Sequence, residues 1–174
     1  MDVTSFSFSA AALRLLLAMA AGGIVGYGRS KRDRAAGFRT YILISMGAAM
    51  AALIVLYEYA MLQGPWQDIV EEVGLKFDAS RLAAQMIAGI GFLGAGTIIK
   101  SSHQQVKGLT TATGLFVSVC MGIASGVGYY ALVLIVMFIL VLVLIAMYFI
   151  FSLGSGRMLG QSDLMNALNM VDYL

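Results

Sequence analysis

The sequence predicts an all-α membrane protein with five transmembrane helices, its amino terminus outside the cell and its carboxyl terminus in the cytoplasm. Hydrophobic residues make up 60% of the 174 residues and charged residues only 11%, with a mean hydropathy of +0.90. A soluble domain carries roughly 25% charged residues, which cover its surface. The helix count comes from five separable apolar stretches, each near the ~20 residues that cross a ~30 Å hydrocarbon core.

The apolar stretches follow one another with short connections. They cover about residues 8–28, 38–62, 80–99, 109–127 and 129–153. Basic residues follow the first stretch instead of preceding it, which is typical of a retained helix and not of a cleaved signal peptide. Only residues 126–128 separate the last two stretches, so a tight antiparallel hairpin is expected there. A short helix on the membrane surface is expected within 67–76.

The connections between the stretches differ in charge. Residues 29–39 hold five basic residues against one acid, and residues 100–107 hold two lysines and no acid. Residues 63–79 hold four acids against one lysine. Because basic loops stay in the cytoplasm, the first two connections are expected inside and the acidic one outside. We therefore expect a transmembrane domain over residues 1–153 and a short cytoplasmic tail over 154–174.

Two parts of the chain share a glycine pattern. In each part, a glycine set precedes a basic connection and then another apolar helix. The glycines with matching spacing are Gly23, Gly26 and Gly28 in the first stretch, and Gly91, Gly94 and Gly96 in the third. Helices one–two and three–four are therefore interpreted as parallel structural repeats, with the fifth helix outside them. Chance similarity between glycine-rich helices is the alternative.

Residues 89–94 spell the dinucleotide-binding motif G-x-G-x-x-G, but their context excludes that function. No strand is expected before them, and no Asp or Glu occurs between residues 79 and 162 to hold a ribose. Small residues at such spacing let neighbouring helices approach closely. The helix-packing candidates are Gly22, Gly26, Gly91, Gly94, Gly96, Gly122 and Gly126. A locally unwound helix whose carbonyl groups line a site is the alternative interpretation.

A candidate outer polar site consists of Asp78, Arg81, Gln85 and Arg14. Polar residues within a membrane are often functional. Asp78 could face a polar cleft and bind a cation, or it could cap its helix and accept a hydrogen bond from Arg81. Arg14 lies about two turns into the first helix, where it could reach the outer interface or pair with Asp78 or Glu58.

A candidate cytoplasmic polar site consists of Arg39, Thr40, Thr110 and Thr111, which open two helices. Free amide and hydroxyl groups at helix starts bind anions or carbonyl groups. Ordinary helix capping, with anionic lipid on the basic cluster, is the alternative. His103 has no partner at metal-ligand spacing, so the sequence assigns no metal site. It shows no Ser-His-Asp, Cys-His or HExxH arrangement, which indicates that the protein is not an enzyme.

Four segments together resemble one known family. They are AGFRT at 36–40, DASRLAAQ at 78–85, GIGFLGAG at 89–96 and VKGLTTA at 106–112. In order and spacing they are similar to the MgtC/SapB family over about residues 10–128. The resemblance implies a bacterial inner-membrane protein tied to growth in low magnesium and, in some pathogens, to survival inside host cells. It also implies a modulator, for example of the proton-driven ATP synthase, more than a magnesium pump.

The chain departs from the family pattern at two places. The family usually has a glutamate before the arginine that ends the first helix, whereas Gly28 precedes Arg29 here. A role that needs this carboxylate is therefore not expected. Longer members also carry a soluble carboxyl-terminal domain that resembles small-ligand-binding modules. This chain is expected to be similar to the compact members, whose activity resides in the membrane part.

The expected function is that of a non-enzymatic modulator that binds another membrane protein through glycine-faced helices. The alternative is an ion or small-solute transporter whose path is lined by Asp78, Arg81, Gln85 and Arg14. The expected partners are membrane lipid and either a second copy of the chain or another membrane protein. Mg²⁺ or another cation is a candidate ligand, and neither a cofactor nor a nucleic acid is expected.

Overall fold

The structure of the protein is a computed structural model that describes residues 7–30, 36–74, 77–100 and 106–158. The described chain is almost entirely helical, with one short pair of strands. In chain order the elements are α1 (Phe8–Ser30), α2 (Phe38–Leu62), α3 (Gln67–Val73), α4 (Ala79–Thr97), β1 (Ile99–Lys100), β2 (Val106–Lys107), α5 (Leu109–Val127) and α6 (Tyr130–Met158).

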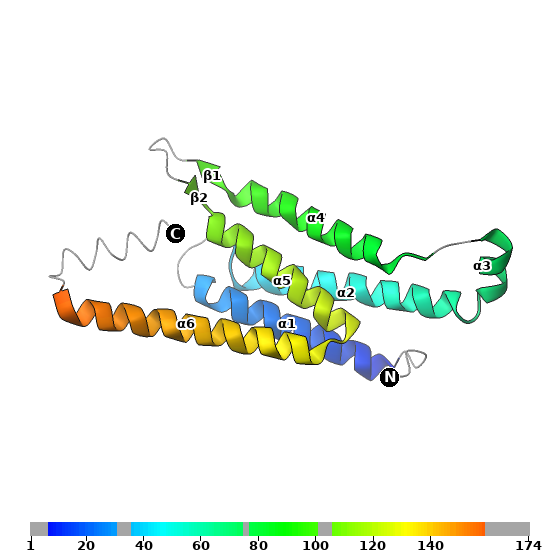
Figure 1. Ribbon diagram of the computed structural model, residues 1–174, viewed down its shortest axis with the longest axis horizontal. Coiled ribbons are helices and arrows are strands. Elements are labelled where there is room, and N and C mark those ends of the chain that lie inside the picture. The colour runs from blue at the N-terminus through cyan, green and yellow to red at the C-terminus, as the bar shows by residue number, and fades with distance from the viewer. Residues whose placement is uncertain (1–6, 31–35, 75–76, 101–105, 159–174) are drawn as a thin grey trace.

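The long helices form an elongated bundle in which the chain reverses direction from one helix to the next. In Figure 1, α4 lies on one side of α5 while α1 and α6 lie on the other. The α3 segment, the start of α1 and the α5–α6 turn lie toward one end of the bundle. The β1–β2 pair and the carboxyl end of α1 lie toward the opposite end (Figure 1).

The centre of the bundle is formed by α1, α2 and α5, which pack closely on one another. Small residues dominate this centre, and the fully buried ones include Ala18, Ala21 and Ala49. The largest fully buried side chain there is that of Tyr41. The α4 helix packs mainly on α5, and Val133 of α6 packs against α1 and α5. The outer two helices are therefore less tightly held than the central three.

The helix bounds agree closely with the apolar stretches of the sequence. Both α2 and α5 have the predicted bounds, 38–62 and 109–127. The short helix predicted within 67–76 is present as α3, which ends before Gly74 because that residue adopts a left-handed conformation at φ 66°. The paired strands between α4 and α5 were not predicted, and α6 continues past residue 153 into the segment predicted as the tail. The rest of that tail, residues 159–174, lies outside the described residues.

Several helices are suited to a membrane. By length and composition, three helical segments of the described chain could cross one: Phe8–Tyr27, Phe38–Leu62 and Leu109–Val127. In α6, the stretch Tyr130–Val143 is also apolar but shorter than these three. The α4 helix is not among the candidate spans, because its sequence includes arginine, glutamine and several glycines. The fold is therefore that of an all-α membrane protein with three candidate spans and a further apolar helix.

Candidate functional site

Glycines of α1 allow this helix to lie directly against the backbone of α2. A methyl group at Gly22 would come within 2.5 Å of the Tyr41 carbonyl oxygen, and one at Gly26 within 2.8 Å of the Phe38 Cα. Real side chains do not reach such distances, so any larger residue would push the two helices apart. Gly22 and Gly26, two of the helix-packing candidates, therefore lie where α1 meets α2.

Glycines of α5 allow the same close approach to the backbone of α2. A methyl group at Gly126 would lie 2.5 Å from the Ala49 carbonyl oxygen. At Gly122 it would collide with the Ser45 carbonyl oxygen and lie 2.9 Å from the Ala48 Cβ. Without a strong hydrophobic effect between helices in lipid, such close van der Waals packing is a main source of stability. The result is a tight three-helix unit of α1, α2 and α5.

The interior of this unit carries hydroxyl groups. Ser45 of α2 and Ser118 and Ser125 of α5 are fully buried, and none of the three hydroxyl oxygens has a hydrogen-bond partner in the structure. A buried hydroxyl without a partner costs about 1 to 3 kcal/mol, which it can recover by turning to a carbonyl of the preceding helical turn. The sequence-based site did not include these serines, since nothing in their spacing showed which helix faces would meet.

Arg14 lies where α1 meets the turn between α5 and α6. Its Nη1 donates to the Gly126 carbonyl oxygen at 3.0 Å, and its Nε donates to the Tyr130 hydroxyl at 3.2 Å. The rest of the guanidinium lies against Gly128, where a methyl group would be 3.2 Å from Nη2. Gly126 is in the last turn of α5, where carbonyl groups lack helical partners. Arg14 therefore ties α1 to this turn, a role that the sequence did not predict.

The three other residues of the outer polar site belong to α4. Asp78 caps this helix, because its Oδ1 accepts from the Ser80 amide at 2.9 Å and from the Ser80 hydroxyl at 2.6 Å. Arg81 and Gln85 are exposed. The hydrogen bonds from Ser80 and the charge of Arg81 lower the pKa of Asp78 below its ordinary value of 3.8. In Figure 1, α4 and α1 lie on opposite sides of α5, and in the described chain Arg14 donates to neither Asp78 nor Glu58.

The residues of the cytoplasmic polar site are placed at the starts of α2 and α5. Arg39, Thr40 and Thr110 are exposed, whereas Thr111 is buried. The Thr111 carbonyl oxygen accepts a hydrogen bond from the Tyr41 hydroxyl at 3.3 Å. This bond joins the first turn of α5 to the first turn of α2, so the two helix starts lie together at one end of the bundle.

The glycines of α4 differ from those of α1 and α5. Only Gly94 meets a neighbouring helix, since a methyl group there would lie 3.4 Å from the Ala112 Cβ, an ordinary contact. A methyl group at Gly91 or Gly96 would meet nothing within 4 Å. Among the described residues of a single chain, Gly91 and Gly96 therefore do not pack against another helix.

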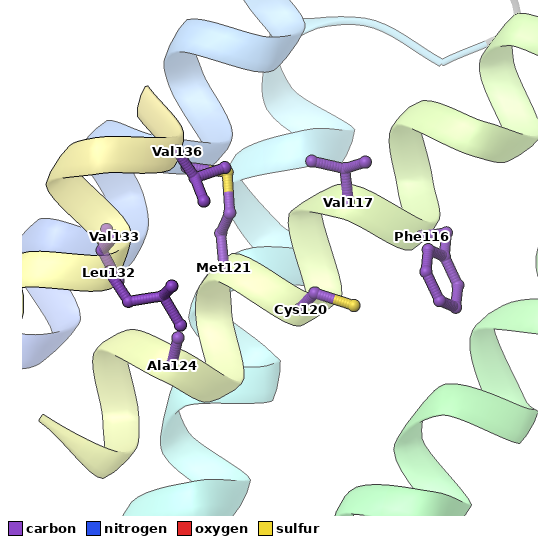
Figure 2. Close-up of a pocket in the computed structure, with 8 residues that line it drawn as sticks. All are labelled: Phe116, Val117, Cys120, Met121, Ala124, Leu132, Val133 and Val136. Carbon is purple, nitrogen blue, oxygen red and sulfur yellow. The ribbon is translucent and has the colours of Figure 1, made fainter. Parts of the chain in front are cut away.

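An apolar groove of about 230 Å³ lies between α5 and α6. Figure 2 shows Leu132 and Val136 of α6 on one side of it and the α5 side chains on the other. The Cys120 sulfur points away from α6 in this view. No group of three His, Cys, Asp or Glu residues that could hold a metal ion occurs in the part of the chain that the structure describes.

Several known proteins are similar to this chain in sequence. YhiD of Escherichia coli K12, whose name assigns it provisionally to magnesium transport, is 39% identical over 120 residues, 69% of this chain and 52% of YhiD. Protein MgtC of Salmonella typhimurium LT2 is 37% identical over 118 residues, 68% of this chain and 44% of MgtC. Protein SapB of Bacillus subtilis is 29% identical over 118 residues, 68% of this chain and 48% of SapB.

The matched region is most of this chain but about half of these relatives' length. No solved structure matches the chain. A model of the MgtC family matches residues 15–152. This range includes the α5–α6 turn that Arg14 contacts, the closely packed glycines of α1 and α5, and the whole of α4. Together with the relatives' identities, this match shows that the chain belongs to the MgtC family.

Proposed function

We propose that the protein acts in magnesium homeostasis in the bacterial inner membrane, as a non-enzymatic modulator of another membrane protein. Membership of the MgtC family and the magnesium-related name of one relative support the connection with magnesium. The modulator role is supported by the contacts of the outer polar residues, which do not face one common cleft.

The observation that carries the proposal is the separation of the outer polar residues. Arg14 is held by the Gly126 carbonyl and the Tyr130 hydroxyl, while Asp78 is occupied as a helix cap. Gln85 lies exposed on α4, on the other side of α5 from α1. A transport path needs polar groups that face one continuous cleft, and these groups face different surroundings. Close glycine packing in the centre also leaves little room for a solute.

One observation favours transport as a second candidate function. The unpartnered hydroxyls of Ser45, Ser118 and Ser125 lie inside the unit that α1, α2 and α5 form. Polar groups inside a membrane bundle often mark ion pathways. In this alternative, the serines and Arg14 would line the path, and Mg²⁺ or another cation would be the solute.

Ion flux into liposomes separates the two functions. The natural protein, Asp78→Ala, Arg81→Ala and Ser118→Ala are each reconstituted, and uptake of Mg²⁺ and H⁺ is followed with fluorescent indicators. We expect background flux for all four, equal to that of protein-free liposomes. Flux by the natural protein that any of these substitutions abolishes would support the transporter and contradict the modulator.

The proposed modulator function also predicts that the chain binds a second membrane protein. Crosslinking in membranes of cells grown at low magnesium, followed by purification of the chain, is expected to recover another membrane protein. Recovery of self-contacts alone would count against the modulator.

The proposal includes five membrane spans with the amino terminus outside, and two parallel repeats. Support comes from the bundle, in which the carboxyl end of α1 and the β1–β2 pair lie toward one end and α3, which carries three of the acids, lies toward the other (Figure 1). At matching places in the proposed repeats, Gly26 packs on Tyr41 and Gly94 packs on Ala112. Superposition of the α1–α2 and α4–α5 pairs tests the repeat, which a different backbone path would exclude.

A further inference from the structure

The α3 helix has an apolar face and a polar face, although none of its residues is buried. Each residue of an α-helix is turned by about 100° from the one before it, which sorts the side chains of α3 onto two sides. The polar face consists of Gln67, Asp68, Glu71 and Glu72. The apolar face consists of Trp66 at the helix start, Ile69, Val70 and Val73. A helix with such separated faces is suited to a boundary between water and an apolar medium.

The chain holds α3 close to the end of α2. The α2 helix is a candidate span of 25 residues, about 37 Å long, whereas the hydrocarbon core is ~30 Å thick. Its end therefore reaches the depth of the lipid headgroups. Only residues 63–66 separate it from α3, and the Trp66 amide donates to the Met61 carbonyl oxygen at 3.0 Å. Beyond α3, the ring of Phe77 returns to Tyr59 of α2, with 5.5 Å between the ring centroids.

The side of α3 that is nearest the bundle belongs to the apolar face. Val70 is partly buried, whereas the other residues of α3 are exposed. On the polar face, the Gln67 side-chain amide donates to the Glu71 carboxylate at 3.4 Å. In Figure 1, α3 lies beyond the end of α2 and runs across the direction of the long helices. A helix in the plane of a membrane has this direction when the long helices cross that membrane.

We propose that α3 binds the lipid interface, with Trp66, Ile69 and Val73 among the upper parts of the acyl chains and its carboxylates in water. A tryptophan ring is favoured at this depth because it is apolar while its N–H stays near water. The helix carries three acids and no base, so repulsion by lipid phosphates turns the polar face outward. The proposal requires only that α2 spans the membrane, and it applies to either candidate function.

The size of the apolar face favours lipid over a protein partner. Trp66, Ile69 and Val73 are 50%, 58% and 67% exposed. Three such side chains offer much less than the ~800 Å² that each partner buries in a stable protein interface. Lipid already surrounds a membrane span at this depth, so the face can be covered without any further partner.

The fluorescence of Trp66 tests the position of α3, because Trp66 is the only tryptophan of the chain. The full chain is reconstituted in phosphatidylcholine vesicles whose acyl chains are brominated either near the headgroup or near the bilayer centre. We expect strong quenching by the shallow bromines, weaker quenching by the deep ones, and little quenching by acrylamide in the water. Ready quenching by acrylamide without quenching by lipid would overturn the proposal. Protection from both quenchers would also overturn it, because the face would then lie against protein.

Two matched double variants test which face is responsible. Ile69→Asn with Val73→Asn changes the apolar face, and Asp68→Asn with Glu72→Asn changes the polar face; all four positions are exposed. We expect the first variant to lose most of the shallow lipid quenching and the second to retain it. Hydrogen exchange of the α2 and α5 amides should be unchanged in both, since α3 packs only lightly on the bundle. Equal quenching in the two variants would refute the proposal, whatever the flux experiment shows.

Discussion

Asp78 is the residue whose chemistry is most completely defined. Its carboxylate accepts from both the amide and the hydroxyl of Ser80, and Arg81 stands three residues further on. These groups favour the charged form, so the pKa of Asp78 is lower in the folded protein than in the unfolded chain. The folded state therefore binds fewer protons. The contribution of this cap to stability is complete above the ordinary pKa of 3.8 and is lost as the pH falls through the lowered value.

A comparison of Asp78→Ala with Asp78→Asn should distinguish the hydrogen-bond acceptor that caps α4 from the negative charge of the carboxylate. Asp78→Ala is expected to speed hydrogen exchange of the Ser80 and Arg81 amides at neutral pH, since the first turn of α4 loses its acceptor. Asp78→Asn should keep slow exchange and remove its acid sensitivity. Exchange measured by mass spectrometry between neutral and acidic pH checks both. Identical pH profiles for the natural protein and Asp78→Asn would contradict the assignment.

Arg14 illustrates how a charged residue within a bundle can serve structure. Arg14→Met keeps the length of the side chain but removes both hydrogen bonds and leaves the Gly126 carbonyl without its donor. We expect a loss of about 1 to 3 kcal/mol in the free energy of unfolding, measured by titration with a denaturing detergent. Arg81→Met is the matched control, because Arg81 is exposed and its loss should change stability by less than about 0.5 kcal/mol. Equal effects of the two substitutions would exclude the tie between α1 and the α5–α6 turn.

At the scale of helices, a methyl group at some glycines would meet the backbone of a neighbouring helix, whereas at others it would meet nothing within 4 Å. Gly122→Ala forces a methyl group against the Ser45 carbonyl oxygen. Because backbone cannot move without shifting the whole of α2, a loss of about 1 to 3 kcal/mol in stability is expected. Thermal unfolding in detergent micelles measures it.

Gly47→Ala is the control on α2 itself. Nothing lies within 4 Å of a methyl group at Gly47, and alanine is the better helix former, so stability should stay the same or rise by up to about 1 kcal/mol. If Gly47→Ala destabilised the protein as much as Gly122→Ala, the close approach of α2 and α5 would not be the cause.

For the whole molecule, the orientation in the membrane can be tested directly. In a Cys120→Ala background, single cysteines at Gln67 and Lys107 are labelled in intact cells with a maleimide that cannot cross the membrane. The charge of the connections predicts labelling at Gln67 and none at Lys107 until the cells are opened. Labelling at Lys107 in intact cells would reverse the proposed orientation.

Much of the fold could be predicted because long apolar stretches in a sequence indicate membrane helices. The bounds of α2 and α5 agree with those stretches, and the Gly128 turn follows from a connection too short for any other path. The strands β1 and β2 were missed since they are only two residues each. The cap at Asp78 was among the predicted alternatives, while the partners of Arg14 were not, because they lie on helices more than a hundred residues further along the chain.

By itself, the sequence determined that the chain is an all-α membrane protein, where α2 and α5 begin and end, and which family its motifs resemble, because these depend on local hydropathy and residue order. Only the tertiary structure decided which faces meet. It buries Gly22, Gly26, Gly122 and Gly126 and leaves Gly91 and Gly96 open, although all six look alike in the sequence. A glycine permits close approach on whichever side a neighbour arrives, and that side is fixed only when all the helices pack together.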